Sequence, residues 1–352
     1  MHKKFVSFFH NNIKTSLQNA IFDIQINKLE YQMTMMPELP IYAKLKTFLK
    51  QRDICLNTYD IPTVKPPYRN IHIDLPYPLP SSFPVWKIIL SERKKNILLC
   101  YEPPIVNPFN YMKIFHHFFI KIYTCIDELV DNKKYFKFRF PKLSRGINTR
   151  PKKFKDKKFL TLINSNKLPF CPFKPLSFFG KELYSERIKA IEFFEQNTPE
   201  KFFLYGKGWN KPKKYNVKEK ILGFKKYSTY KGEFVDKIEL LSNFKYCLCF
   251  ENLTNVNGYI TEKIFDCFKA RCVPIYWGAE NIEKYIPKDC FIDFRDFKDF
   301  KKLLAFLDSI DETKYNSYIE NIEMLLTDKN FIESWFEDGF VKFFLEDVLE
   351  IK

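Results

Sequence analysis

The sequence predicts an α/β protein built on open, mostly parallel sheets. In the second half of the chain, short apolar runs alternate with segments of helical periodicity. Glycine is scarce, at nine in 352 residues, and six of the nine fall between positions 206 and 278, where the backbone must turn sharply or approach a ligand closely. Strands that alternate with helices over such a length are typical of a parallel sheet covered by helices.

The second half supplies most of the expected elements. We expect strands at 159–164 and 202–205 and helices at 180–195 and 232–242. They are followed by a compact unit in which strand 246–250 leads through the polar loop 251–258 to a helix. Thr261 is the expected N-cap of that helix, which runs to about Arg271, and 273–277 is a buried strand closed by Gly278.

The first half gives weaker signals. We expect a helix over 41–53, a buried strand over 95–101 and a core helix over 111–126, which its lysines and histidines make a poor membrane segment. The proline-rich stretch 61–85 predicts an extended loop. Beyond residue 297 the sequence predicts amphipathic helices that pack back across the protein, because acidic residues are interleaved with the aromatic ones.

These patterns predict two α/β domains that join near residues 145–158, with a ligand cleft between them. We place the first domain at 1–150 and the second at 151–335, and we expect a helical tail at 336–352 that packs back on the first domain.

The net charge of +16 belongs entirely to residues 1–160, which hold 28 basic and 12 acidic residues. It is densest over 133–158, where twelve basic residues accompany one acid. Such a stretch is either a solvated linker between domains or a surface for anionic membrane, acidic glycan or nucleic acid.

The cysteines and histidines indicate the redox state of the protein and limit where a metal site could lie. The nine cysteines form no CxxC pair, which favours reduced thiols and a cytoplasmic protein, peripheral to the membrane if the basic stretch binds lipid. Cys247 and Cys249 are spaced as small core residues on one face of a strand, so no metal site is expected there. All five histidines precede residue 118, and DxD, GxGxxG and Walker patterns are missing.

The loop and helix start at 251–263 have the character of a nucleotide site. The N-terminus of a helix at the edge of a parallel sheet presents backbone N–H groups and a positive dipole to an anion. Glu262 and Lys263 stand at that opening. A carboxylate can accept hydrogen bonds from ribose hydroxyls, and an ammonium group can neutralise a phosphate.

Ordered motifs give this unit a family resemblance. FENLTNVNGYITEK, then CVPIYWGAENIEKYIP and FIDFRDF, resemble the donor-binding signature of the α-1,3/4-fucosyltransferases, glycosyltransferase family 10. FLTLINSNK, ELYSERIKAIEFF and LYGKGW are similar to the same family in the same order. The resemblance covers about residues 159–297 strongly and 95–142 weakly, and it does not reach the first 80 residues.

The resemblance implies a GT-B type of α/β fold, with two Rossmann-like domains facing a central cleft. It implies an N-terminal acceptor domain, a C-terminal domain for GDP-fucose as donor, no required cofactor, and inversion at the anomeric carbon. By the same resemblance Asn252, Tyr259, Glu262 and Lys263 bind the donor, with Glu262 on the ribose and Lys263 on the diphosphate.

The general base and the second phosphate cation are less well marked. Inversion requires a base beside the acceptor hydroxyl, and Glu102 stands where the family places a glutamate ahead of a proline and an asparagine. Here two prolines follow it directly, so the match is loose. No arginine lies between Arg187 and Arg271, and Lys207 and Lys231 are the substitutes for the phosphate-binding arginine that the family usually supplies. We expect Arg187 to form a local salt bridge.

The sequence therefore predicts a fucosyltransferase that acts on a glycan or glycolipid acceptor, with α-1,3 or α-1,4 linkage to a GlcNAc-type sugar favoured. Its expected partners are the nucleotide sugar and the acceptor, with no nucleic acid. Two alternatives stay open: a family relative that uses another GDP-sugar, and a non-enzymatic basic protein that binds nucleic acid through 133–158.

Overall fold

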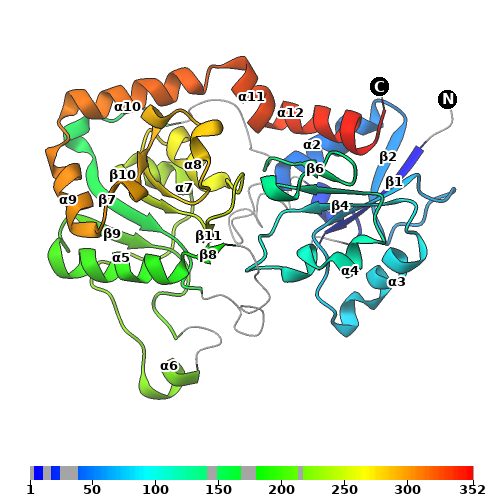
Figure 1. The fold of residues 1–352 in the computed structure, drawn as a ribbon, viewed down its shortest axis with the longest axis horizontal. Helices are drawn as coiled ribbons and strands as arrows, with labels where there is room; N and C mark the ends of the chain where they lie inside the picture. Colours follow the sequence, from blue (N-terminus) through cyan, green and yellow to red (C-terminus); the bar gives the residue numbers. More distant parts are fainter. Residues whose placement is uncertain are drawn as a thin grey trace. The chain divides into compact units, whose positions relative to one another are not determined.

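The computed structural model describes residues 4–10, 17–23, 39–140, 149–167, 180–212 and 217–351. Its contacts divide the chain into two compact units, Met1–Arg145 with Lys329–Lys352, and Gly146–Asp328. Each unit is a parallel sheet with helices on both faces (Figure 1). The residues around the join, 141–148, lie outside the described part of the chain.

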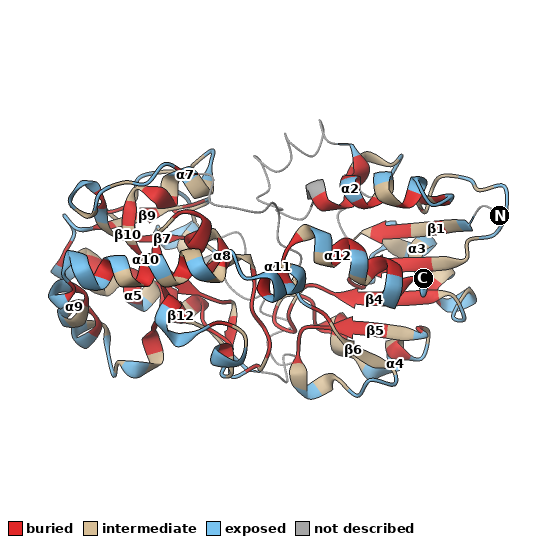
Figure 2. Ribbon diagram, turned by 90° about the horizontal axis from the view of Figure 1, so that it is seen from above, coloured by how far each residue is buried: buried red, intermediate tan, exposed pale blue. Residues whose placement is uncertain are grey.

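The N-terminal unit contains a six-stranded sheet whose neighbouring strands are all parallel, in the order β2-β1-β3-β4-β5-β6. The strands are β1 (Lys4–His10), β2 (Ile54–Thr58), β3 (Arg69–Ile73), β4 (Asn96–Cys100), β5 (Lys121–Thr124) and β6 (Tyr135–Lys137). β4 is buried along its whole length, as Figure 2 shows, because helices cover both of its faces.

The two faces of this sheet carry separate cores. Alternate β4 residues point to opposite sides, so Ile97 and Leu99 join the core beneath α2 (Leu39–Lys50). Leu98 and Cys100 join the core beneath α3 (Phe83–Ser91) and the short α4 (Lys113–His116).

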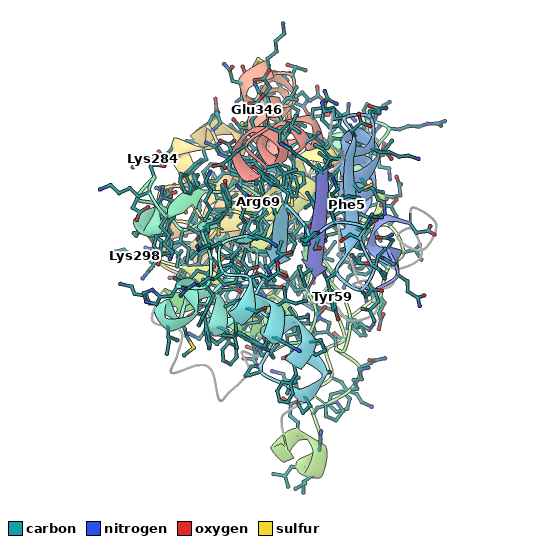
Figure 3. The ribbon with its side chains drawn as sticks, turned by 90° about the vertical axis from the view of Figure 1, so that its right-hand side faces the viewer. Phe5, Tyr59, Arg69, Lys284, Lys298 and Glu346 are labelled. Atoms are coloured by element: carbon teal, nitrogen blue, oxygen red, sulfur yellow. The ribbon has the colours of Figure 1, made fainter. Side chains whose placement is uncertain are left out.

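The C-terminal segment completes the first of these cores. After α11 (Lys329–Trp335), six apolar residues of α12 (Glu337–Phe343), of a π-helical turn (Phe344–Val348) and of the residue that follows it lie in the α2 core. These residues are Phe340, Val341, Phe344, Leu345, Val348 and Leu349. Polar contacts fix the segment further, since Glu350 pairs with Arg69 at 3.3 Å and with Lys121 at 2.7 Å. Figure 3 shows the first strands of the unit, with Phe5 and Arg69 labelled, and the C-terminal segment at Glu346.

The C-terminal unit contains a five-stranded parallel sheet in the order β13-β12-β10-β7-β9. The strands are β7 (Lys158–Ile163), β9 (Phe202–Tyr205), β10 (Phe244–Phe250), β12 (Val273–Trp277) and β13 (Ile292–Asp293). A two-stranded ribbon, β8 (Lys181–Glu182) with β11 (Leu253–Thr254), lies beside it. The strand order reverses between β7 and β10, and ligands bind above such a point in open α/β sheets.

Helices cover both faces of this sheet as well. One core contains residues of α5 (Tyr184–Asn197), α9 (Phe300–Ser309) and α10 (Glu312–Leu325). Strand β10 is also contacted by α7 (Lys237–Ser242) and α8 (Glu262–Lys269). Cys247 and Cys249 are buried on β10. A six-residue helix, α6 (Val217–Leu222), stands apart from the sheet in Figure 1.

Four predicted elements differ from the structure. The helix expected from residue 180 begins only at Tyr184, because Lys181 and Glu182 form β8 and pair with β11. The apolar stretch 111–126 is a short helix followed by the strand β5, because an apolar run of this kind fits either a buried helix or a helix-turn-strand. The stretch 61–85 contains β3, a strand between β1 and β4, formed by the residues between its proline clusters. The helix expected from residue 232 begins only at Lys237, where the Asp236 carboxylate caps it.

Among the helices of the described residues, none has the length and apolar character that a membrane span requires.

Candidate active site

A buried carboxylate links the end of β10 to the start of α8. The Glu251 side chain is fully buried directly after the strand. It accepts hydrogen bonds from the Thr261 backbone N–H at 2.8 Å, from Thr261 Oγ1 at 2.7 Å and from Lys263 Nζ at 3.0 Å. A buried carboxylate is tolerated only when donors surround it, so these bonds fix the first turn of α8 to the sheet.

Gly278 makes room for this carboxylate. A Cβ atom at position 278 would meet Glu251 Cγ at 2.5 Å and would also overlap the Tyr276 hydroxyl. The hydroxyl itself accepts a hydrogen bond from the Ala279 N–H at 3.0 Å, and the Gly278 carbonyl accepts one from Thr254 Oγ1 at 2.8 Å. The turn after β12 therefore closes tightly over Glu251.

Lys263 is held between two carboxylates. Its Nζ lies 3.0 Å from Glu251 Oε2 and 3.7 Å from Glu262 Oε1. Burial alone would lower the pKa of Lys263, but the two carboxylates outweigh it and the pKa lies above its ordinary value. Lys263 is therefore a cation fixed in place at the start of α8, the feature that the sequence predicted for a diphosphate.

Glu262 has a second lysine near it. Lys237, at the start of α7, pairs with Asp266 of α8 at 2.8 Å. Burial would lower the pKa of Lys237, but Asp266 and Glu262 together raise it. The starts of α7 and α8 thus bring two acids and two lysines together, and Lys237 belongs to this group although the sequence did not single it out.

Arg187 lies beneath the same loop. Its guanidinium, buried on α5, donates to the carbonyl oxygens of Phe250 at 2.7 Å and Glu251 at 2.6 Å, and to Asn252 Oδ1 at 3.0 Å. The local salt bridge expected of Arg187 was therefore wrong, because its partners are carbonyl and amide oxygens. The arginine instead holds the loop that follows β10, and its Nε is a buried donor without a hydrogen-bond partner.

The predicted donor residues fall into two groups. Asn252 contacts Arg187, the buried Tyr259 interacts electrostatically with Arg187, and Glu262 and Lys263 begin α8, so these four lie around the carboxyl end of β10. Lys207 and Lys231 lie elsewhere. Both are exposed and belong to the carboxyl end of β9, where the Lys231 N–H donates to the Leu204 carbonyl at 2.9 Å. β9 is two strands from β10, or about 10 Å.

In the N-terminal unit Glu102 follows β4 at the carboxyl edge of the sheet. Asp74, which follows the neighbouring β3, holds the backbone here. Its Oδ1 accepts from the N–H groups of Tyr101 at 2.8 Å and Glu102 at 3.0 Å, and from Asn110 Nδ2 at 2.5 Å. The Glu102 carbonyl accepts from the Tyr111 hydroxyl at 3.1 Å. The backbone of Glu102 is thus fixed, and its side chain is half-buried.

Asp74 is itself an unusual acid. It is buried and has a left-handed backbone, with φ of 59°. Burial raises its pKa to about 6, although the hydrogen bonds from Glu102, Asn110 and Tyr101 act in the opposite direction. Two carboxyl groups at adjacent strand ends, one of them with a raised pKa, are a combination suited to acid–base chemistry.

The described residues contain no cluster of three or more His, Cys, Asp or Glu side chains that could hold a metal ion. The cationic groups of the candidate site are the side chains of lysine and arginine.

Residues 210–333 match the family model described as the C-terminal part of glycosyltransferase family 10 (fucosyltransferase). Most of the matched residues lie in the C-terminal unit, and they include β10, α8 and β12. This confirms the resemblance that the ordered motifs predicted.

Curated fucosyltransferases align with the chain over short stretches. An α-(1,3)-fucosyltransferase of Helicobacter pylori is 43% identical over 58 residues, which are 16% of this chain and 12% of that protein. The human 4-galactosyl-N-acetylglucosaminide 3-α-L-fucosyltransferase 9 is 38% identical over 109 residues, 28% of this chain and 30% of that protein. The chain thus spans less than a third of the length of these relatives.

Solved structures extend the likeness over both units. An α1,3-fucosyltransferase matches with a TM-score of 0.53 and 16% identity, over 97% of this chain and 88% of that one. WaaG, a glycosyltransferase involved in lipopolysaccharide biosynthesis, matches with a TM-score of 0.51 and 9% identity, over 96% and 98%. Such low identities concern the fold alone, and the expected GT-B type with two Rossmann-like α/β domains is confirmed.

Proposed function

We propose that the protein is an inverting fucosyltransferase that moves L-fucose from GDP-fucose to a hydroxyl of a glycan or glycolipid acceptor. The favoured product is an α-1,3 or α-1,4 linkage to a GlcNAc-type sugar. The observation that carries the proposal is the family 10 match, which includes the first turn of α8 with both Glu262 and Lys263. The names of the curated relatives support fucose as the transferred sugar.

The first turn of α8 would bind the nucleotide. Glu262 would accept hydrogen bonds from the ribose hydroxyls, and Lys263 would neutralise the diphosphate as it leaves. Glu251 and Arg187 would act as positioning residues, because their hydrogen bonds hold α8 and the loop after β10 in place. With lysine supplying the positive charge, we propose that transfer needs no metal ion, so EDTA should leave turnover unchanged.

Glu102 would take the proton from the acceptor hydroxyl as the bond from that oxygen to the anomeric carbon forms and the bond to GDP breaks. Asp74 would keep the Glu102 backbone in place through the hydrogen bond to its N–H. Glu102→Gln should abolish transfer and leave GDP affinity intact. Loss of both would indicate a structural role for Glu102 instead.

The function is tested by GDP release from a panel of GDP-sugars, with and without N-acetyllactosamine-type acceptors. We expect release from GDP-fucose that depends on the acceptor, with the product linkage determined by NMR. Acceptor-dependent release from another GDP-sugar alone would replace fucose by that sugar. Salt-sensitive binding of RNA or DNA without affinity for GDP would overturn the enzymatic function.

A further inference from the structure

Exposed apolar side chains gather on one part of the N-terminal unit. Among its described residues, five of the seven exposed large apolar side chains lie between positions 79 and 120. They are Leu79 (56% exposed), Phe83 (63%), Leu90 (52%), Ile114 (66%) and Ile120 (36%). The other two, Leu17 and Val64, are far from them in the sequence. We call these five residues, with the basic residues between them, the α3–α4 surface.

The segments that carry the α3–α4 surface pack on the same face of the sheet. The rings of Trp86 on α3 and Phe115 on α4 lie 5.0 Å apart, and both pack on the core beneath these helices. The side-chain amide of Asn96 donates to the Ile89 carbonyl at 2.8 Å and to the Phe118 carbonyl at 3.1 Å. The end of α3 and the segment after α4 therefore lie side by side.

The charge on this surface is of one sign. Phe83, Lys87 and Leu90 are exposed at i, i+4 and i+7 and so share one stripe of α3. Three further cations, Arg93, Lys94 and Lys113, are also exposed. Only two acids occur between residues 79 and 120. One is the half-buried Glu102. The other is Glu92, whose carboxylate pairs with Lys95 at 3.1 Å and accepts a hydrogen bond from Asn70 Nδ2 at 3.2 Å.

We propose that the α3–α4 surface docks on an anionic lipid bilayer. Large apolar side chains that alternate with cations, without exposed acids, match the boundary between acyl chains and anionic headgroups. The Phe83 and Leu90 side chains would enter the acyl boundary. Lys87 would place its ammonium among the headgroups while its stem lies along the apolar surface.

The basic stretch 133–158, the site at which the sequence suggested lipid contact, fits a membrane less well over its described residues. Lys137 pairs with Asp127 at 2.5 Å, and Lys152 donates to Asn243 Oδ1 at 2.8 Å. Lys157 is buried and donates to the Arg271 carbonyl. Three of its cations are therefore held within the protein, and no exposed large apolar side chain lies among its described residues, so the α3–α4 surface is the better candidate.

Sedimentation of the full chain with lipid vesicles tests this proposal. Phosphatidylcholine vesicles containing phosphatidylglycerol should bind the protein, and pure phosphatidylcholine vesicles should bind it less well. The double variant Phe83→Ser, Leu90→Ser should lower affinity by about tenfold or more, because it removes the inserting side chains. Lys87→Glu with Lys113→Glu should remove the preference for anionic lipid.

The matched control is Ile221→Ser with Leu222→Ser. It removes two side chains of α6 that are 75% and 74% exposed beside lysines in the other unit, and it should bind vesicles like the unchanged protein. Turnover on a soluble acceptor and the melting temperature should change in neither the Phe83/Leu90 variant nor the Ile221/Leu222 variant. Equal vesicle binding by the Phe83/Leu90 variant, loss in the α6 variant instead, or no vesicle binding at all would overturn the proposal. Self-association in solution that the Phe83/Leu90 variant abolishes would assign the surface to a second copy of the chain.

Discussion

At the scale of single residues, Lys263 offers the most direct test of the donor site. Lys263→Ala should lower kcat/KM if the ammonium neutralises the leaving diphosphate. The loss should correspond to about 2 to 4 kcal/mol of transition-state stabilisation. Steady-state kinetics with GDP-fucose measure this loss. Lys225→Ala is the control, because that lysine is exposed and pairs with Glu192 at 3.0 Å on the surface, and it should leave kcat/KM unchanged.

The same variant also leaves Glu251 with one donor fewer, so a loss of stability could imitate a loss of chemistry. The double variant Lys263→Ala, Glu251→Gln separates the two effects because it leaves no unpaired buried carboxylate. A folded double variant that stays inactive would support the role at the diphosphate. Full activity in either variant would refute it.

Asp74 predicts a pH dependence of stability. Its pKa rises from 3.8 to about 6 in the folded state, so between pH 4 and 6 the folded protein binds more protons at this site than the unfolded chain does. The free energy of unfolding therefore falls as pH rises through that window, by up to about 3 kcal/mol. Asp74→Asn removes this titration and retains an oxygen to accept the same hydrogen bonds.

We expect the melting temperature of Asp74→Asn, relative to the unchanged protein, to increase between pH 4 and pH 7. Asp156→Asn, at an exposed acid, is the control and should show a flat difference. A difference for Asp74→Asn that does not change with pH would mean that this carboxyl group has no raised pKa in the folded state.

At the scale of the elements, the packing of β10, α8 and the turn after β12 requires a residue without a side chain at position 278. Gly278→Ala would place a Cβ atom against Glu251 and Tyr276. The carboxylate would have to move away from Thr261 and Lys263, which should cost about 1 to 3 kcal/mol of stability and weaken GDP binding. Calorimetric titration with GDP and thermal unfolding measure the two effects.

Gly223→Ala provides the comparison. Gly223 has φ of 89°, but a Cβ atom there has no neighbour within 4 Å, so only backbone strain is added. That variant should retain full GDP affinity. If Gly278→Ala binds GDP as tightly as Gly223→Ala does, the packing of Glu251 is not needed for the donor site.

The elements differ in how far the sequence predicted them. β9 and β12 were predicted at their observed bounds, and α8 began after Thr261 as expected, because each has a local apolar period with a clear boundary. β3 and β5 were missed. Their short apolar runs become strands only by pairing with β1 and β4, and no local pattern encodes that pairing.

At the scale of the whole molecule, the same reasoning explains which site residues the sequence could indicate. Glu262 and Lys263 lie within one motif, so their proximity follows from sequence spacing. Arg187 and Asp74 act through hydrogen bonds to residues 63 to 65 and 27 to 36 positions away. Only the assembled sheets bring those groups together. The signals for Glu251 were its place in the FEN triplet and its position directly after the apolar run 246–250.

The C-terminal segment 329–352 belongs to the N-terminal unit. Its apolar side chains fill part of the core beneath α2, so we expect them to stabilise that unit. Phe344 is fully buried in the core beneath α2, with its ring 5.9 Å from that of Phe340. Phe344→Ala should destabilise the N-terminal unit by about 3 to 5 kcal/mol, because the core cannot collapse fully around the cavity. Glu346→Ala, an exposed neighbour on the same turn, should change stability by less than about 0.5 kcal/mol. Urea unfolding measures both, and GDP binding by the C-terminal unit should survive in both. Equal unfolding midpoints for the two variants would show that the C-terminal segment adds little to the N-terminal core.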